Sequence, residues 1–440
     1  MKTLPKIFFA CLCLLVAIEI GFTNFKKNVV SEVDNRYLQE WRLDKIDTYF
    51  QDRIGFRSEI IDFVKYNYYC KIFHTLVHSL YEYGTGGHVF YKMNHELFDT
   101  VFIDDFCSYI KQVQDYCESR NVSFLYCLNP SKISIYSEFL PKGYVYRNRF
   151  FQYFTSRLEY YGVHYIENFT MLKEKHFSEP VFNHQYDGGH WNDLGAFYGT
   201  NHLLSELKKA HPKIELLTMD DFERDSIQQK YIGQILKIPI NEWVPNYILN
   251  YKNIWDNTRD YWGVDLHPQH QAFATIFTDK DSLPRVLFFH GSYYNPRTKF
   301  YQDRFYKTAI VHNYENFLNF DYYFNIFQPE CVILETAEYT TNPSCFNHNK
   351  IKGKNLNRPY KEVCMQPHRE IGFSELIGLQ VDSVSKMCKI SFAIEDGVSF
   401  GYLLSKGREY DLSVESSEHK CTITLMGCDY DEKNAKIVLF

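Results

Sequence analysis

The sequence predicts an α/β fold, in which helices flank a mostly parallel sheet and a small β-rich module follows at the C-terminal end. Short apolar strands alternate with helical segments between about residues 100 and 340, which is the pattern of a parallel sheet. Residues 370–440 instead hold short alternating segments, such as 388–392 and 421–425. The chain has 440 residues, 45% of them hydrophobic, which is enough for a large core and for two or three domains.

Each element is predicted from its own apolar pattern. Residues 23–100 are expected to be largely helical, with a short strand at 88–91 after a glycine-rich turn. The other elements are a helix at 103–120, a strand at 122–128, a helix at 150–161, a strand at 163–166, a helix ending near 209, and strands at 285–289 and 331–335. The stretch from 210 to 280 is poorly patterned, and 340–365 is polar and loop-like. Sites in such sheets form at the carboxyl ends of strands, and Asn129, Ser292 and Glu335 lie at or near predicted strand ends.

One strand runs directly into a turn of small residues that presents a serine. The strand Arg285–Phe289 is followed by His290, Gly291, Ser292 and Tyr293. Many α/β hydrolytic folds display a nucleophile on such a strand–turn junction. An ordinary strand end is the alternative, because glycine and serine are common turn residues.

A second segment, about a hundred residues upstream, could supply a base for that serine. Asp187–Trp191 reads Asp-Gly-Gly-His-Trp. A serine nucleophile needs a base, and the base needs a group that orients it and stabilises its charged form. Asp187 and His190 are three residues apart, so on one helical turn they would share a face. A polar loop before a helix, with Asn192 or Asp193 as its N-cap, is the alternative reading.

Composition excludes some classes of function. The net charge of -6 argues against a nucleic-acid partner. The twelve cysteines have no zinc-type spacing. We expect neither a metal site nor a cofactor. Aromatic residues make up 18% of the chain, which suits a packed core and, at a groove, the stacking of sugar rings.

The N-terminal segment predicts export. Lys2 and Lys6 precede an apolar run at residues 7–22, which is shorter than the roughly 20 residues that span a bilayer. Because no good Ala-x-Ala cleavage site follows, an uncleaved signal anchor in residues 1–25 is favoured over a removed signal peptide. The rest of the chain would then lie outside the cytoplasm, in the cell envelope or periplasm.

Taken together, ordered motifs resemble the alginate O-acetyltransferase family, the AlgJ/AlgX-type branch of the SGNH hydrolase-like superfamily. The motifs are Phe50–Arg57, Gly84–Tyr91, Asn129–Tyr136 with Leu140-Pro141, Asp187–Trp191, Gly291–Tyr293 and Gln328–Glu335. They cover about residues 45–340, and their order is more specific than any one of them. The resemblance implies a permuted SGNH-like domain, in which the Asp/His pair precedes the serine.

The resemblance also implies roles for individual residues. Ser292 would carry the acetyl group as a covalent ester, His190 would act as base, and Asp187 would orient it. Candidates for oxyanion or substrate binding are Asn129, Lys132, Arg57, Gly291 and Tyr293. Two departures from the family concern this machinery: His290-Gly291-Ser292 replaces the usual Gly-Asp-Ser or Gly-Thr-Ser, and the Asp-to-His spacing is one residue longer.

The expected function is therefore O-acetyl transfer to a cell-surface or exported polysaccharide. Residues 26–345 would form the acetyltransferase domain, and residues 366–440 the β-rich module, for which carbohydrate binding and a packing role are both open. The acetyl donor would reach the site through a membrane acyltransferase, as the resemblance implies. A polysaccharide O-acetyl esterase, with water as acceptor, and a non-catalytic carbohydrate-binding component are the alternatives.

Overall fold

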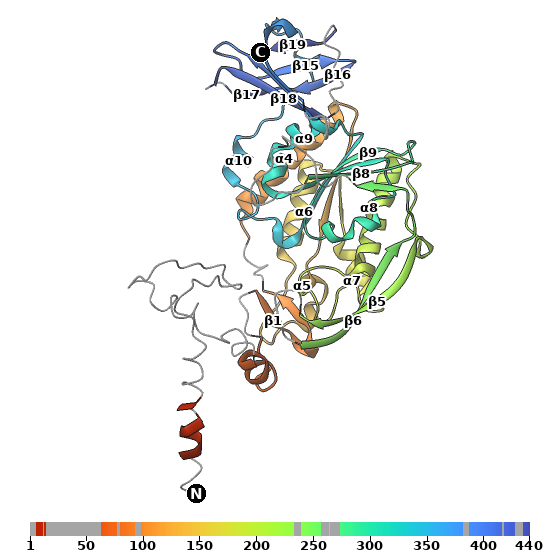
Figure 1. Cartoon of the computed structure of the whole chain (residues 1–440), viewed down its shortest axis with the longest axis vertical. Helices are drawn as coiled ribbons and strands as arrows, with labels where there is room; N and C mark the ends of the chain where they lie inside the picture. Colours follow the sequence, from red (N-terminus) through yellow and green to blue (C-terminus); the bar gives the residue numbers. More distant parts are fainter. Residues whose placement is uncertain are drawn as a thin grey trace. The chain divides into compact units, whose positions relative to one another are not determined.

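The computed structural model describes residues 6–11, 13–14, 63–76, 80–92, 98–232, 239–256, 264, 273–381, 387–415, 418–426 and 434–440 (Figure 1). The chain divides into two compact units, Met1–Tyr83 with Lys230–Asn241, and Gly84–Gln229 with Glu242–Phe440. Described elements of the first unit include the π-helical turn η2 (Lys65–Cys70) and the short strand β1 (Tyr81–Tyr83). Arg57 and most of the predicted signal anchor lie outside the described residues. Among the residues that are described, no helix is both long and apolar enough to cross a membrane.

A seven-stranded sheet in the order β4-β3-β11-β9-β10-β8-β7 forms the centre of the second unit. Its strands are β3 (Ser123–Asn129), β4 (Tyr165–Glu167), β7 (Ile254–Asp256), β8 (Phe273–Thr278), β9 (Arg285–His290), β10 (Lys307–His312) and β11 (Cys331–Ala337). From β4 to β10 the neighbouring strands are parallel, whereas β8 and β7 add antiparallel pairs at one edge. The predicted α/β class with a mostly parallel sheet is confirmed.

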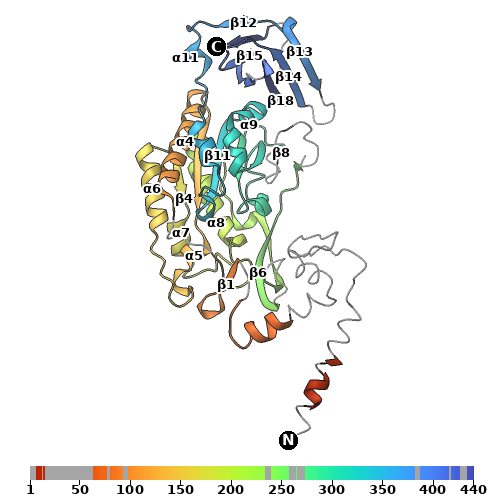
Figure 2. The same cartoon turned by 90° about the vertical axis from the view of Figure 1, so that its left-hand side faces the viewer.

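Helices cover both faces of this sheet, which explains why its central strands read as continuous apolar runs (Figure 2). The helices are α4 (Thr100–Ser119), α5 (Lys132–Ile135), α6 (Arg149–Tyr161), α7 (Phe169–Lys175), α8 (Asp193–Ala210) and α9 (Phe320–Phe327). Successive side chains of a strand point to opposite faces. Accordingly, Leu287 and Phe289 pack with α4, α6 and α9, while Val286 and Phe288 pack with α7 and α8.

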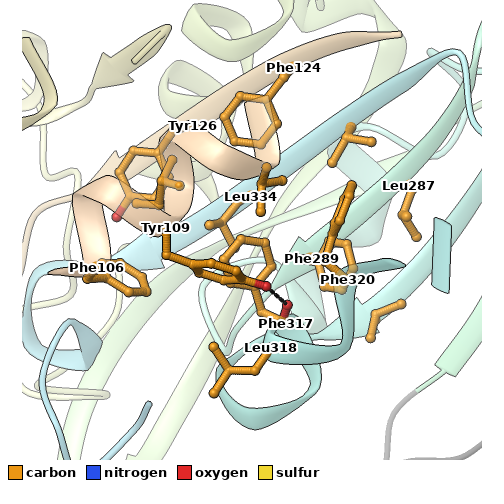
Figure 3. Close-up of a cluster of buried hydrophobic side chains, with 14 of the residues drawn as sticks. Phe106, Tyr109, Phe124, Tyr126, Leu287, Phe289, Phe317, Leu318, Phe320 and Leu334 are labelled. Carbon is orange, nitrogen blue, oxygen red and sulfur yellow. Dashed lines mark hydrogen bonds between the residues drawn. The ribbon is translucent and has the colours of Figure 1, made fainter. Parts of the chain in front are cut away.

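Aromatic side chains fill the first of these two cores (Figure 3). Phe106 and Tyr109 of α4 lie beside Tyr126 of β3 and Leu334 of β11. The buried hydroxyl of Tyr109 donates a hydrogen bond to the backbone carbonyl of Phe317 at 3.1 Å, so this polar group is satisfied inside the core. Part of the high aromatic content therefore serves packing.

Short helices, the strand β2 and a two-stranded ribbon complete the α/β region. They are β2 (Val89–Tyr91), η3 (Thr85–Gly87), η4 (Ser137–Phe139), η5 (Met219–Asp221), β5 (Phe222–Tyr231), β6 (Pro239–Leu249), η6 (Asn295–Phe300), η7 (Tyr314–Asn319), η8 (Glu338–Thr340), α10 (His348–Gly353) and α11 (Tyr360–Val363). The sequence did not predict β5, β6, β7, β8, β10 or α9. β5 and β6 pair with each other, and β5 is almost wholly exposed, so it carries no apolar alternation for a pattern to detect.

The C-terminal region consists of two four-stranded sheets, as the alternating segments predicted. One has the order β12-β19-β15-β16 and the other β13-β14-β18-β17. The elements are β12 (Arg369–Ile371), η9 (Phe373–Glu375), β13 (Leu376–Val381), β14 (Met387–Ala393), β15 (Gly401–Ser405), β16 (Arg408–Asp411), β17 (Ser413–Glu415), β18 (Lys420–Met426) and β19 (Lys436–Leu439). Residues from both sheets share one apolar core. A buried hydrogen bond from the Tyr116 hydroxyl to Asp411 (2.8 Å) joins this region to α4.

Candidate active site

Three neighbouring strands end at one edge of the parallel sheet, where sites of α/β proteins commonly form. β3 ends at Asn129, β9 runs into Gly291 and Ser292, and Glu335 lies near the end of β11. The Glu335 carboxylate joins the three strands, because it accepts hydrogen bonds from the Gly291 N–H (2.8 Å) and from the Asn129 side-chain amide (2.9 Å). Of the predicted strand-end residues, Glu335 thus binds Asn129 directly and holds the turn of Ser292 through its neighbour Gly291.

Asp187, His190 and Ser292 form a continuous chain of hydrogen-bond contacts. The Nδ1 of His190 lies 2.8 Å and 3.0 Å from the two carboxylate oxygens of Asp187, and its Nε2 lies 2.8 Å from the Oγ of Ser292. An ionised carboxylate only accepts, so a neutral His190 carries its proton on Nδ1 and turns its Nε2 lone pair toward the serine hydroxyl. Such an imidazole can take the hydroxyl proton, which is what activation of a serine requires.

The Asp187 carboxyl is held in its ionised form. Burial raises the pKa of Asp187, but the His190 imidazole, the hydrogen bond to it and the Arg297 guanidinium together lower that pKa further, so it lies below its ordinary value. The Oδ1 atom also accepts the backbone N–H groups of Gly189 and His190, each at 3.2 Å. An ionised Asp187 can orient the imidazole and stabilise the imidazolium.

The segment around Asp187 is a loop, so the helical turn suggested by the Asp-to-His spacing is wrong. Asp187 has a left-handed φ of 57°, which aspartate tolerates because its short side chain can hydrogen-bond locally. The helix α8 begins only at Asp193, and Asn192 is its N-cap, with Oδ1 accepting the Gly195 N–H at 3.0 Å. The Asp187–His190 contact comes from a local turn in which the Asp187 carboxylate also accepts the backbone N–H groups of Gly189 and His190.

Buried side chains tie the histidine-bearing loop to the nucleophile turn. The indole N–H of Trp191 donates to the carbonyl of Tyr293 at 3.1 Å, and the Tyr293 hydroxyl lies 2.7 Å from the carbonyl of Pro130 and 3.0 Å from that of Gly189. The Arg297 guanidinium donates to the carbonyl of Trp191 at 2.5 Å. Tyr293, predicted for oxyanion or substrate binding, is only 1% exposed, and its hydroxyl is engaged with the backbone.

Two further predicted candidates for the oxyanion site face the protein interior. The Gly291 N–H donates to Glu335, so it is not available to a substrate oxygen. Asn129 is fully buried; its amide donates to Glu335, and its Oδ1 accepts from Asn168 at 2.8 Å. Both residues therefore hold the nucleophile turn in place.

Lys132 is engaged with the backbone as well. Its buried ammonium donates to the carbonyls of Val89 (2.7 Å) and His184 (2.8 Å). Burial lowers the pKa of Lys132 to about 7, while the carboxylates of Glu242 and Asp187 act to raise it. Lys132 thus fastens β2 to the segment that leads into Asp187. The other basic candidate, Arg57, lies outside the described residues.

Sequence reasoning missed Tyr339, which lies close to the candidate nucleophile. Its hydroxyl is 3.5 Å from the Oγ of Ser292, and its ring lies beside those of His190 and Tyr293. Burial raises the pKa of Tyr339 well above its ordinary value, so the phenol stays a neutral hydrogen-bond donor. The one signal in the sequence was its place just after the predicted strand that ends at Glu335.

His290 is a buried, neutral imidazole beside the nucleophile turn. Its Nε2 lies 2.8 Å from the Tyr301 hydroxyl, and burial lowers its pKa from an ordinary value of 6.5 to about 3. A group with a lowered folded-state pKa contributes stability above its unfolded pKa and loses it as the pH falls toward the folded value. His290 therefore makes the fold sensitive to acid between about pH 6.5 and pH 3.

We expect the His290→Gln variant to lose less stability in acid than the wild type. In the wild type, His290 binds a proton at pH 5 in the unfolded chain but not in the folded one. The free energy of unfolding is therefore about 2 kcal/mol lower at pH 5 than at pH 7 from this residue, and glutamine cannot take this proton. Urea unfolding of both proteins at the two pH values measures the difference. Equal losses in both proteins would contradict the assignment, since all other titrating groups are common to both.

Fold and site together define an α/β protein with a serine, a histidine and an aspartate in hydrogen-bond contact at the carboxyl edge of its sheet. No family model matches the chain, and no curated protein matches it in sequence. Solved structures do resemble it. A DHHW family protein from Eubacterium siraeum has 15% sequence identity and a TM-score of 0.46, over 64% of this chain and 98% of that one.

Two further solved structures are similar at comparable identity. PatB1 from Bacillus cereus has 16% identity and a TM-score of 0.47, over 59% of this chain and 96% of its own. The O-acetyltransferase domain of Pseudomonas putida AlgJ has 14% identity and a TM-score of 0.42, over 62% of this chain and 99% of its own. AlgJ belongs to the family that the ordered motifs resemble.

Proposed function

We propose that the chain is an O-acetyltransferase that moves acetyl groups to an exported polysaccharide, on a permuted SGNH hydrolase-like domain. The observation that carries acyl transfer is the chain of contacts from Asp187 through His190 to Ser292. The ordered motifs support the choice of acetyl as the transferred group and of a polysaccharide as its acceptor. They also support a permuted domain, in which Asp187 and His190 precede Ser292 in the sequence.

In the first half-reaction, Ser292 takes the acetyl group. His190 removes the hydroxyl proton, Oγ attacks the acetyl carbonyl carbon, and the bond between that carbon and the donor oxygen breaks. The proton passes from the imidazole to the departing donor oxygen, so atoms and charges balance. Asp187 stabilises the imidazolium that exists between the two proton transfers.

In the second half-reaction, a sugar hydroxyl attacks the acetyl-serine. His190 accepts the proton of that hydroxyl and returns it to the Ser292 Oγ as the serine ester breaks, which restores the starting state. If water attacks instead, the product is acetate and the enzyme is an esterase. The acceptor therefore decides between transfer and hydrolysis.

Two donors near Ser292 can stabilise the oxyanion of each tetrahedral intermediate. Within the described residues, the Ser292 N–H has no hydrogen-bond acceptor, and it belongs to the same turn as the nucleophile. The Tyr339 hydroxyl is the second donor, 3.5 Å from Oγ before any substrate binds. Preorganised donors of this kind are each worth roughly 3–4 kcal/mol of transition-state stabilisation.

The protein would act outside the cytoplasm, where a membrane protein would supply the acetyl donor. The basic start and apolar run of residues 1–25 support an exported protein of the cell envelope, anchored at its N-terminus. An acetyl donor delivered by a membrane acyltransferase would suit such a location.

Covalent labelling tests the acyl-transfer step. Purified protein is mixed with an activated acetyl ester, quenched, digested and examined by mass spectrometry. We expect one acetyl group on the peptide that contains Ser292, and faster loss of that group when an oligosaccharide with free hydroxyls is present. Acetate release at the same rate with and without the sugar would identify an esterase. No adduct on Ser292 would exclude the serine mechanism.

A further inference from the structure

The loop that carries Asp187 needs support from outside itself. Residues 184–190 form neither helix nor strand, and Asp187 holds a left-handed φ of 57°. Outside a helix or strand, the backbone N–H and C=O groups of such a loop must find partners elsewhere in the protein. The backbone donors and acceptors of this loop therefore show what keeps the Asp187 carboxylate aimed at His190.

One carboxylate takes three consecutive backbone donors of the loop. Glu242, in β6, accepts the N–H of His184 at 2.5 Å through Oε1, and the N–H groups of Gln185 and Tyr186 at 2.8 Å and 2.7 Å through Oε2. Successive N–H groups that converge in this way form an anion-binding concavity. A half-buried carboxylate in such a place makes charge-assisted hydrogen bonds, which are stronger than neutral ones.

The carbonyl groups of the same loop are held from β2 and Lys132. The His184 carbonyl accepts from the Val89 N–H at 3.0 Å and from the Lys132 ammonium at 2.8 Å, and the Gly188 carbonyl accepts from the Tyr91 N–H at 3.1 Å. Lys132 also binds the Val89 carbonyl. The backbone N–H groups of the loop thus bind the Glu242 carboxylate, and its carbonyl groups bind the Lys132 ammonium and the backbone of β2.

β6 also reaches the far end of the segment that bears Asp187 and His190. The Tyr247 N–H donates to the carboxylate of Asp193 at 2.9 Å, and Asp193 is the first residue of α8. The Tyr247 ring packs against Phe222 and Phe300, which fixes this part of the strand. A single strand therefore contacts the backbone just before Asp187 and the helix just after His190.

We propose that Glu242 is a positioning residue for the candidate catalytic aspartate, acting together with Lys132. It does not contact the reacting atoms; it holds the backbone of residues 184–186 so that the Asp187 carboxylate faces the Nδ1 of His190. This inference rests on the proposed serine chemistry. It predicts that loosening the loop slows acylation of Ser292 and leaves the acetyl donor's binding unaffected.

The Glu242→Gln variant tests the inference with an almost isosteric change. The substitution replaces one carboxylate oxygen by an NH₂ group, which must face at least one backbone N–H of the loop. Two hydrogen-bond donors then face each other, and that hydrogen bond is lost. We expect kcat with an activated acetyl ester to fall roughly tenfold to a hundredfold, because small misplacements of catalytic groups cost this much. KM should be unchanged, and a sulfonyl fluoride should still label Ser292 completely, but more slowly.

Glu223→Gln is the matched control, since Glu223 is an exposed carboxylate on β5 and the variant removes the same charge. Its kcat should equal that of the wild type. A Glu242→Gln variant that is folded and has wild-type kcat would overturn the inference. Failure of the wild type itself to be labelled would instead refute the serine mechanism, so the two failures are distinguishable.

A milder variant decides the question if Glu242→Gln does not fold. Glu242→Asp keeps the carboxylate but shortens its reach, so circular dichroism should show a native fold. A lower kcat at unchanged KM in this variant supports the positioning role. Wild-type kcat in folded Glu242→Asp, when Glu242→Gln is unfolded, would show that Glu242 serves stability alone and would overturn the inference.

Discussion

Acetyl transfer should fall by on the order of 10⁶ in the Ser292→Ala variant, because removal of a serine nucleophile leaves only the contributions of binding and the oxyanion donors. Stopped assays with an activated acetyl ester, followed by product quantification, measure the loss. Ser344→Ala is a suitable control, since Ser344 lies on an exposed loop. Activity in Ser292→Ala within about tenfold of wild type would point to another nucleophile.

The Asp187→Asn variant belongs to the same prediction. Its amide would place a donor against the Nδ1–H of His190, so the imidazole would move its proton to Nε2 and could no longer accept from Ser292. Loss of the orienting carboxylate in this way costs on the order of 10⁴ in kcat. The melting temperature should change little by comparison, because asparagine also tolerates the left-handed φ of this position.

The second large effect is expected at Glu335, the buried carboxylate beneath the nucleophile turn. Both of its oxygens accept from donors, the Gly291 N–H and the Asn129 amide. Glu335→Gln keeps the shape but replaces one acceptor by a donor, so one of these buried groups loses its partner. An unsatisfied buried donor costs about 1–3 kcal/mol, and a displaced Gly291 would also move Ser292 away from His190.

Urea unfolding and turnover measurements on Glu335→Gln check this expectation together. Glu330→Gln is the matched control, because Glu330 lies just before the same strand, is exposed and accepts the Arg285 N–H at 2.8 Å. We expect a clear loss of stability and of kcat only at Glu335. Burial raises the pKa of Glu335 to about 7, while the hydrogen bonds from Gly291 and Asn129 act to lower it.

The sign of this shift gives the pH dependence. A folded-state pKa raised above its unfolded value contributes stability that is complete below about pH 4.5 and is lost as the pH rises through about 7. The stability difference between wild type and Glu335→Gln should therefore vary across that interval. If the variant matched the wild type in stability and turnover throughout, Glu335 would not hold the turn through its two hydrogen bonds.

Much of the α/β region could be predicted from local pattern. The runs at 122–128, 285–289 and 331–335 are apolar because both faces of the central strands are covered by helices, and they correspond to β3, β9 and β11. The helices predicted at 103–120 and 150–161 correspond to α4 and α6. Exposed strands such as β5 carry no such signal, since little of their side-chain surface is buried.

Only part of the candidate site could be predicted from the sequence. Asp187, His190 and Ser292 stood out because their residue types and neighbouring glycines suit serine chemistry. Glu335 was placed at a strand end but its role was not predicted, and Glu242 was not predicted at all, because an acidic residue becomes an internal hydrogen-bond acceptor only when the fold brings backbone N–H groups to it. Tyr339 likewise lies beside Ser292 only because of the fold, since it belongs to the short helix η8 that follows β11.

The class of fold, the strand that ends at a serine and the residues able to act on that serine could all be predicted from the sequence. Three features depend on the folded chain: His190 lies 2.8 Å from Ser292, a loop rather than a helix orients Asp187, and other candidate residues form hydrogen bonds inside the protein, namely Asn129, Gly291, Tyr293 and Lys132. The reason is physical. Apolar periodicity records which faces of an element are buried, whereas the partners of a polar group depend on contacts between residues far apart in the chain.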